Sequence, residues 1–274
     1  MEPRIESPKR LVDLFDHFLI DLDGVVYVGD KAVKGAKEAI EAIRRLGKGV
    51  IFLTNDPRGS SREYSKRLKG MGIPASPKEV ITSSMAVAEY IKEHYKLDGK
   101  RAYVVGSKTL KEEIKATGLR LSQGEEAKGA DFVIVGGHQG FNYEEMKTAA
   151  FAIRKGALFF ATNRDPVFPT QEGLVPATGA ILASIEVASG KKATVVGKPE
   201  PIMFEVAKKL LPSSKRIAII GDRLDTDILG GKRAGISTVL VLSGSTNRDD
   251  LSKSDIKPDY VINDLRDLLK DRPL

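Results

Sequence analysis

Short runs of apolar residues alternate with amphipathic stretches along most of this chain. The apolar runs are typical of strands and read FLID, GVIFLTN, RAYVVG, DFVIVGG, ALFFATN, RIAIIGD, STVLVL and DYVI. The stretches between them have helical periodicity, as in GAKEAIEAIRRLG, SSREYSKRLKGMG, YEEMKTAAFAIRKG and PIMFEVAKKLL. Because strands that alternate with helices are typical of βαβ units, the pattern predicts an α/β fold with a mostly parallel sheet.

Two seams in the pattern predict how the chain divides into domains. They lie near SPKEVITSS (76–84) and near PATGAI (176–181). If both are real, residues 82–181 form an α/β module inserted into a domain built from residues 1–81 and 182–274. No run approaches the length of a membrane span, and the first ten residues have no signal-like apolar core. We therefore expect a cytoplasmic protein that does not bind membranes.

Composition excludes several classes of site. The chain has 274 residues and no cysteine, which rules out disulfides, thiolate zinc sites and a cysteine nucleophile. The formal net charge is +7, but Lys and Arg are spread along the helices, so we expect no nucleic-acid partner. A mild positive field would instead favour anionic small molecules. The chain contains few Asn and Gln and many Lys and Glu, a composition that is typical of proteins from thermophiles.

Two carboxylates, Asp21 and Asp23, end the first apolar run. Side chains two apart on a strand point the same way, and Gly24 permits a sharp turn, so both can reach one site beyond the strand. Such a pair could bind Mg²⁺, supply a carboxylate nucleophile or act as an acid/base partner. Alternatively, one of the two simply caps a turn.

A second carboxylate cluster follows another strand, in RIAIIGDRLDTDILGG. Asp222 ends this strand as Asp21 ends the first, and two such strands favour a divalent-cation site more than either alone. Asp225 or Thr226 could instead cap a helix that is expected to begin near Asp227.

Two more strand ends carry groups that suit a phosphate. In VIFLTNDPRGSS, the Thr54 hydroxyl, Asn55 and nearby backbone N–H groups could hold a phosphoryl oxygen. An ordinary loop with Ser60 as helix cap explains the same stretch. In TVVGKPEP, Lys198 is fixed before a proline and could neutralise a phosphate or a carboxylate cluster.

In this order, the four segments resemble the motifs of the haloacid dehalogenase superfamily of phosphotransferases. DLDGV is similar to the first motif, LTN to the second, GKP to the third and GDRLDTD to the fourth. The long insertion before the third motif resembles the branch of NagD-type and 4-nitrophenyl phosphatases (subfamily IIA, with a C2-type cap). That branch also shows ATNRDPVFP followed by GLVPATGAI, much as residues 161–181 read here. The resemblance spans Phe18 to Asp267 and implies a doubly wound, Rossmann-like core with a smaller inserted α/β cap domain.

The resemblance also implies a mechanism, the Mg²⁺-dependent hydrolysis of small-molecule phosphomonoesters. Asp21 would attack phosphorus and form an aspartyl-phosphate, while Asp23 would protonate the leaving alcohol and then activate water. Mg²⁺ would be held by the Asp21 carboxylate, the Asp23 main-chain carbonyl and Asp222, with Asp227 supporting these ligands from behind.

The remaining roles concern the phosphoryl group and the leaving group. Thr54 and the Asn55 backbone would hold the phosphoryl oxygens, and Lys198 would balance their charge. The cap would exclude water, and related caps often pair subunits, so a homodimer through the cap is expected. The cap residues expected to face the substrate are Asn163, Arg164 and Asp165, although the first and last could merely shape a loop before Pro166.

Some positions depart from the family pattern. Asp56 stands where a second Asn is common, and an acid there could weaken or tune substrate binding unless it points away. His138 lies in a stretch that usually contains Asp, and PATGA replaces PGAGA. Two other functions share some of these residues: a phospho-accepting, receiver-like regulatory domain, and a D-x-D nucleotide-sugar transferase. Receivers are much shorter, and transferase sites usually follow a nucleotide-binding half.

Overall fold

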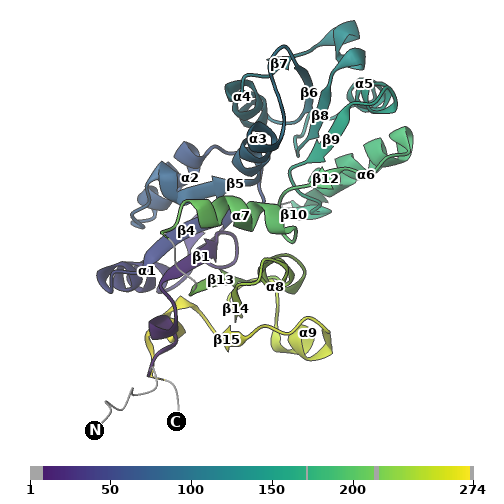
Figure 1. Ribbon diagram of the computed structural model, residues 1–274. Helices are drawn as coiled ribbons and strands as arrows, with labels where there is room; N and C mark the ends of the chain where they lie inside the picture. Colours follow the sequence, from purple (N-terminus) through teal and green to yellow (C-terminus); the bar gives the residue numbers. More distant parts are fainter. Residues whose placement is uncertain (1–8, 171, 213–215, 272–274) are drawn as a thin grey trace. The chain divides into compact units, whose positions relative to one another are not determined.

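The computed structural model describes residues 9–170, 172–212 and 216–271. Contacts between residues divide the chain into two compact units (Figure 1). The first unit comprises the described parts of Met1–Leu53, Ser65–Val80 and Ala207–Leu274, and the second comprises Thr54–Tyr64 and Ile81–Val206. Among the described helices, none is both long and apolar enough to cross a membrane.

Helices and strands alternate along most of the chain, as the pattern predicts. The helices are α1 (Ala36–Arg45), α2 (Ser61–Gly70), α3 (Ser83–His94), α4 (Lys108–Ala116), α5 (Tyr143–Arg154), α6 (Thr178–Ser189), α7 (Pro201–Lys209), α8 (Leu229–Arg233) and α9 (Arg248–Lys253). The strands are β1 (His17–Asp21), β2 (Tyr27–Val28), β3 (Lys31–Ala32), β4 (Gly49–Thr54), β5 (Val80–Thr82), β6 (Arg101–Val105), β7 (Arg120–Leu121), β8 (Phe132–Val135), β9 (Leu158–Ala161), β10 (Val167–Thr170), β11 (Gly173–Pro176), β12 (Thr194–Val195), β13 (Ile217–Gly221), β14 (Ser237–Val241) and β15 (Tyr260–Ile262).

A six-stranded sheet in the order β15-β14-β13-β1-β4-β5 carries the first unit. Strand β1 lies between β13 and β4 and is parallel to both. Both β1 and β13 are almost wholly buried, which explains why their sequences are continuous apolar runs. Ile20 pairs with Ile220, so the carboxyl ends of the two strands bring Asp21 and Asp222 to the same sheet edge.

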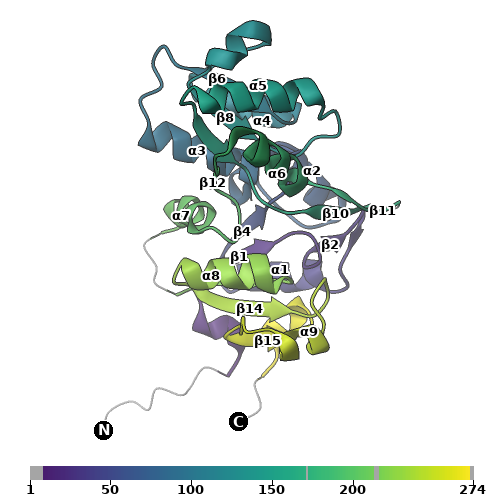
Figure 2. The same ribbon diagram turned by 90° about the vertical axis from the view of Figure 1, so that its right-hand side faces the viewer.

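The second unit has its own parallel sheet, five strands in the order β12-β9-β8-β6-β7. Helices α3 and α4 lie on one side of this sheet, and α5 and α6 lie on the other (Figure 1). Figure 2 shows α5 and α6 side by side, with the antiparallel β10–β11 hairpin extending from the start of α6. The expectation of a parallel-sheet α/β core with an additional α/β region is confirmed.

The second unit extends past the boundary that we expected at residue 181. That position lies inside α6, whose Leu182 and Ile185 share a buried core with Val133 and Ala149. Strand β12 pairs with β9 and so adds to the same sheet. Contacts up to Val206 therefore belong to this unit. The pattern of apolar residues marks each element but does not say which sheet it covers.

Candidate active site

Three of the predicted aspartates meet in the first unit. One carboxylate oxygen from each of Asp21, Asp222 and Asp227 lies within 4.8 Å of the others. Their exposed fractions are only 8%, 2% and 1%. Buried carboxylates at this spacing repel one another unless a cation or a shared proton compensates. A set of hard oxygen donors is what Mg²⁺ and Ca²⁺ prefer, so the residues present fit a divalent cation.

The Asp222 carboxylate is enclosed by a turn that the sequence analysis did not single out. The Ser245 backbone N–H donates to Asp222 Oδ2 at 2.6 Å. A Cβ at Gly244 would lie 2.1 Å from Oδ2, and one at Gly24 would lie 2.3 Å from it. Gly24 also has a φ of +84°, which disfavours any other residue. The only sequence signal was a Ser/Gly-rich turn after the strand STVLVL.

A single π-helical turn, Leu224–Ile228, places Asp227 in the carboxylate group. The Arg223 N–H donates to Asp227 Oδ2 at 3.1 Å, which orients that side chain. The suggestion that Asp225 or Thr226 caps a helix near Asp227 is wrong. The helix begins at Leu229 without a side-chain cap, and Asp225 pairs with the Arg223 guanidinium at 2.8 Å.

Asp23 projects from the same end of β1 but its carboxylate is not in the group of three. Its side chain is exposed, and the Tyr27 hydroxyl lies 3.4 Å from Oδ2. The Gly24 N–H donates to the Tyr27 carbonyl at 2.8 Å, which fixes the turn after β1. A carboxylate that stays outside the cation site is better suited to proton transfer than to metal coordination.

The second unit contains a hydrogen-bonded network around Asn55. Its side-chain Nδ2 donates to the Lys198 carbonyl at 2.9 Å and to Asp165 Oδ2 at 3.0 Å. Its Oδ1 accepts from the Lys198 N–H at 2.9 Å. The Asn55 carbonyl accepts from Asn163 Nδ2 at 2.6 Å and from Ser83 Oγ at 2.5 Å. The amide of Asn55 therefore holds the Lys198 backbone in place.

Two polar side chains near this network are almost fully buried. Thr54 and Lys198 are each 3% exposed. The Thr54 hydroxyl accepts from the Asp56 N–H at 3.1 Å, which leaves its own proton to donate. Burying a lysine is costly unless negative charge lies near it. The peptide bond between Lys198 and Pro199 is cis. A hydroxyl donor and an ammonium group are both able to bind a phosphoryl oxygen.

The three residues expected to face the substrate do not act as a set. Asn163 and Asp165 contact Asn55, whereas the Arg164 side chain contacts Glu186 instead. Arg164 makes two hydrogen bonds to Glu186 at 2.7 and 3.0 Å. The Arg164 bonds, together with Lys192, lower the pKa of Glu186 to about 2 despite its burial.

Asp56, the departure from the family pattern, is compensated locally. Both carboxylate oxygens accept from Arg58, at 2.8 Å each. Burial opposes ionisation of Asp56, but the Arg58 hydrogen bonds and charge outweigh it, so the pKa is lowered. The Arg58 guanidinium in turn lies 3.9 Å from the centroid of the Phe168 ring, on β10. Ser60 caps α2, because its Oγ accepts from the Glu63 N–H.

Comparison with known proteins shows the family of the chain. A model of haloacid dehalogenase-like hydrolases matches residues 18–120, and a related HAD-hydrolase-like model matches residues 195–268. An acid sugar phosphatase of Staphylococcus saprophyticus is 34% identical over 93% of this chain and 96% of its own. The chain belongs to the haloacid dehalogenase-like hydrolases.

Solved structures of relatives refine the likeness. The glycerol phosphate phosphatase of Mycobacterium tuberculosis, in complex with magnesium, has a TM-score of 0.89 and 33% identity, covering 96% of this chain and 80% of its own. A 4-nitrophenylphosphatase of Thermotoga maritima has a TM-score of 0.87 and 33% identity, covering 94% and 97%. The resemblance stated from the sequence is confirmed, and so is the prediction that the chain is a hydrolytic enzyme.

Proposed function

We propose that this enzyme hydrolyses small-molecule phosphomonoesters with Mg²⁺, through an aspartyl-phosphate on Asp21. The observation that carries the proposal is the buried group of three carboxylates, two at the ends of β1 and β13 and the third, Asp227, in the π-helical turn that follows β13. The names of the relatives support it, since they act on sugar phosphates, glycerol phosphate and 4-nitrophenyl phosphate, and one was crystallised with magnesium.

The carboxylates of Asp21 and Asp222 would hold the metal together with the Asp23 main-chain carbonyl. Asp227, oriented by the Arg223 N–H, would support these ligands. When bound, Mg²⁺ neutralises charge on the phosphoryl oxygens and on the carboxylates around it.

Asp21 and Asp23 divide the chemical work. A carboxylate oxygen of Asp21 attacks phosphorus, and the bond from phosphorus to the alcohol oxygen breaks as Asp23 gives that oxygen a proton. Asp23 then takes a proton from water, whose oxygen attacks phosphorus and releases Asp21 and inorganic phosphate. The exposed position of the Asp23 carboxylate, outside the group of three buried aspartates, supports this assignment because solvent water can reach it.

In the second unit, we assign the phosphoryl oxygens to the Thr54 hydroxyl and the Asn55 N–H, and charge balance to the Lys198 ammonium. The Asn55 side chain is a positioning group, because it holds both backbone polar groups of Lys198. Phosphoryl transfer depends chiefly on such positioning and on neutralised charge.

We further propose that the insertion in the second unit serves as a cap and carries a homodimer contact. Helices α5 and α6 expose large apolar side chains there, with Phe151 42% exposed and Val187 85% exposed. Light scattering of the native chain and of Val187→Glu tests the dimer. A dimeric mass that the substitution reduces is expected, and a monomeric native chain would overturn it.

Phosphate release from 4-nitrophenyl phosphate tests the function. Native protein with Mg²⁺ should turn over many times, and both a chelator and Asp21→Asn should abolish turnover. The matched control is Asp30→Asn, because the Asp30 side chain is 96% exposed. Undiminished turnover in Asp21→Asn would overturn the proposal, and a single phosphorylation without turnover would indicate a receiver-like role. Sugar phosphates and glycerol phosphate would then be compared as substrates.

A further inference from the structure

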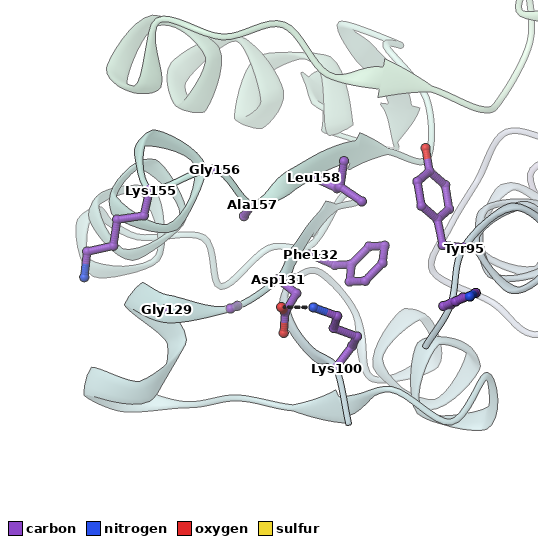
Figure 3. A pocket seen from close by; sticks show the side chains of 11 residues that line it. Tyr95, Lys100, Gly129, Asp131, Phe132, Lys155, Gly156, Ala157 and Leu158 are labelled. Atoms are coloured by element: carbon purple, nitrogen blue, oxygen red, sulfur yellow. Dashed lines mark hydrogen bonds and ion pairs between the residues drawn. The ribbon is translucent and has the colours of Figure 1, made fainter. Parts of the chain in front are cut away.

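Among the described residues that line the hollow in Figure 3, no set of polar groups converges on one position. The hollow lies in the second unit and has a volume of about 470 Å³, and Asp131 in its wall is paired with Lys100 at 2.9 Å. The Lys155 side chain extends away from Tyr95, on the far side of the hollow. A more specific arrangement of side chains surrounds Asp23, in the first unit.

Tyr27, at the start of β2, lies next to the Asp23 carboxylate. The Tyr27 side chain is fully buried, and its hydroxyl donates to Asp23 Oδ2 at 3.4 Å. This distance is at the long end of hydrogen bonding, so the hydroxyl orients the carboxylate without holding it tightly. In the backbone, the Gly24 N–H donates to the Tyr27 carbonyl at 2.8 Å, and the Tyr27 N–H donates to the Leu22 carbonyl at 3.2 Å. The turn after β1 therefore keeps the hydroxyl close to Asp23.

Arg67, on α2, braces the hairpin formed by β2 and β3. Its guanidinium carbon lies 4.1 Å from the centroid of the Tyr27 ring, which is a cation–π contact. Its Nη2 donates to the Gly29 carbonyl at 2.5 Å, in the turn between β2 and β3. The same nitrogen lies 3.5 Å from a carboxylate oxygen of Asp30, but the Asp30 side chain is 96% exposed, so this ion pair contributes little. Arg67 thus holds both the Tyr27 ring and the hairpin turn.

We propose that Tyr27 and Arg67 are positioning residues for the proton transfer assigned to Asp23. The inference rests on the proposed function, in which the Asp23 proton passes to the alcohol oxygen as the bond from that oxygen to phosphorus breaks. A carboxyl group rotates easily about its terminal bond, and only some orientations bring its proton to the alcohol oxygen. Because Oδ2 accepts from Tyr27, the proton is left on the other oxygen of Asp23. Arg67 keeps the Tyr27 hydroxyl in the place where it has this effect.

The leaving group determines how much a well-placed acid contributes. The 4-nitrophenolate anion is stable and leaves phosphorus without a proton, whereas the alkoxide of benzyl phosphate is strongly basic and needs one. Both esters carry one aromatic ring, so they are similar in size. The value of kcat/KM covers the steps up to release of the alcohol, so the later activation of water by Asp23 does not enter it. A misplaced acid should therefore change the ratio of the two kcat/KM values.

Steady-state kinetics of the full chain with Mg²⁺ and these two esters test the proposal. Tyr27→Phe should lower kcat/KM for benzyl phosphate by about tenfold and Arg67→Met by about fivefold, with a loss below about twofold for 4-nitrophenyl phosphate. The ratio does not depend on the fraction of folded protein, so a variant that is merely destabilised leaves it unchanged. In an Asp23→Asn background, where the acid is gone, Tyr27→Phe should have no further effect on the ratio.

Two matched controls should keep the native ratio. Tyr260→Phe removes a hydroxyl from β15, in the same sheet. Arg44→Met removes a guanidinium of α1 that pairs with Glu79 at 2.9 Å. These variants separate the loss of any hydroxyl or guanidinium from the loss of the contacts made by Tyr27 and Arg67.

Three outcomes would overturn the inference. One is a native ratio in Tyr27→Phe, and another is an equal loss of kcat/KM with both esters. The third is a further fall in the ratio when Tyr27→Phe is added to Asp23→Asn, because Tyr27 would then act independently of the acid. Failure of the proposed function would look different, since it would leave turnover undiminished in Asp21→Asn.

Discussion

The carboxylate group of the first unit and the Asn55 network of the second unit use buried polar residues in opposite ways. Asp21, Asp222 and Asp227 bring like charges together, and their repulsion must be offset by a cation or a shared proton. Around Asn55, by contrast, donors and acceptors of the protein already match, and Lys198 is held before any ligand binds. The first region is built to be completed by a ligand, whereas the second is preorganised for one.

Among the substitutions considered, Asp222→Asn should have the largest effect on turnover. At fixed Mg²⁺, turnover should fall by about 10²–10³-fold, because a charged ligand is lost from the metal site. Without metal, the variant should be at least as stable as the native chain, since one repelling charge is gone. Mg²⁺ titration of turnover and thermal unfolding with and without Mg²⁺ measure the two effects.

The matched control is Asp225→Asn. Asp225 lies three residues after Asp222, in the π-helical turn Leu224–Ile228, and its side chain is 67% exposed and pairs with Arg223. It should leave turnover and the Mg²⁺ requirement unchanged. A metal-free Asp222→Asn protein that unfolds at a lower temperature than native would contradict the repulsion argument.

Asn55→Ala should destabilise the chain, whereas Asp222→Asn without metal should not. It removes two hydrogen bonds to Lys198 and one to Asp165, so the free energy of unfolding should fall by about 2–4 kcal/mol with or without Mg²⁺. Displacement of Lys198 should lower kcat/KM by about 10²-fold. Urea unfolding and steady-state kinetics measure these effects.

Asn142→Ala is the control for Asn55→Ala. Asn142 caps α5 through the Glu145 N–H, so its loss should cost about 1 kcal/mol and leave kcat/KM unchanged. Equal kinetic effects from the two alanine variants would show that Asn55 has no special role in positioning Lys198.

Gly244→Ala should displace a carboxylate of the first region without removing a charge. Its Cβ would lie 2.1 Å from Asp222 Oδ2, so the carboxylate must move and the apparent Mg²⁺ affinity should fall by about 10-fold. Gly70→Ala is the control, because a Cβ there meets no atom within 4 Å. The Mg²⁺ concentration for half-maximal turnover reports the difference, and equal values for both variants would argue against a tight enclosure of Asp222.

Substitution of Glu186 should have the smallest effect, a change in how the free energy of unfolding depends on pH. Its pKa is about 2 in the folded chain and near 4.5 in the unfolded chain, so its contribution is present above about pH 4.5 and is lost as the pH falls toward 2. We expect Glu186→Gln to lower the free energy of unfolding at pH 7 by about 1–3 kcal/mol, after allowing for the exposure of its partners.

In Glu186→Gln, the decrease in stability between pH 4.5 and 2 should be shallower than in the native chain. Denaturant unfolding at several pH values measures this, and identical slopes would contradict the pairing. Turnover of folded protein at pH 7 should change little, because Arg164 points to Glu186 and not to Asn55.

Most of the first region could be predicted because it follows from a parallel sheet. Apolar runs that end in Asp21 and Asp222 must bring both residues to one edge once their strands pair in parallel. The position of Asp227 depends on a π-helical turn, and the enclosure by Gly244 and Ser245 depends on a turn after β14. Neither leaves a periodic signal in the sequence.

The second region was harder to predict because its contacts join distant segments. The Asn55–Lys198 pairing spans 143 positions, and nothing local in LTND or GKPE specifies which side-chain atoms meet. Arg164 pointed away from its two neighbours because Glu186, a buried acid on α6, attracts it.

The most direct test of the central claim is to locate the phosphoryl group during turnover. Native protein is mixed with Mg²⁺ and 4-nitrophenyl phosphate, quenched in acid and digested, and the peptides are analysed by mass spectrometry. The account predicts one added phosphoryl group on the peptide that contains Asp21, absent from Asp21→Asn and from protein treated with chelator. A phosphoryl group on any other residue, or turnover with no phosphorylated peptide at any time of quenching, would contradict it.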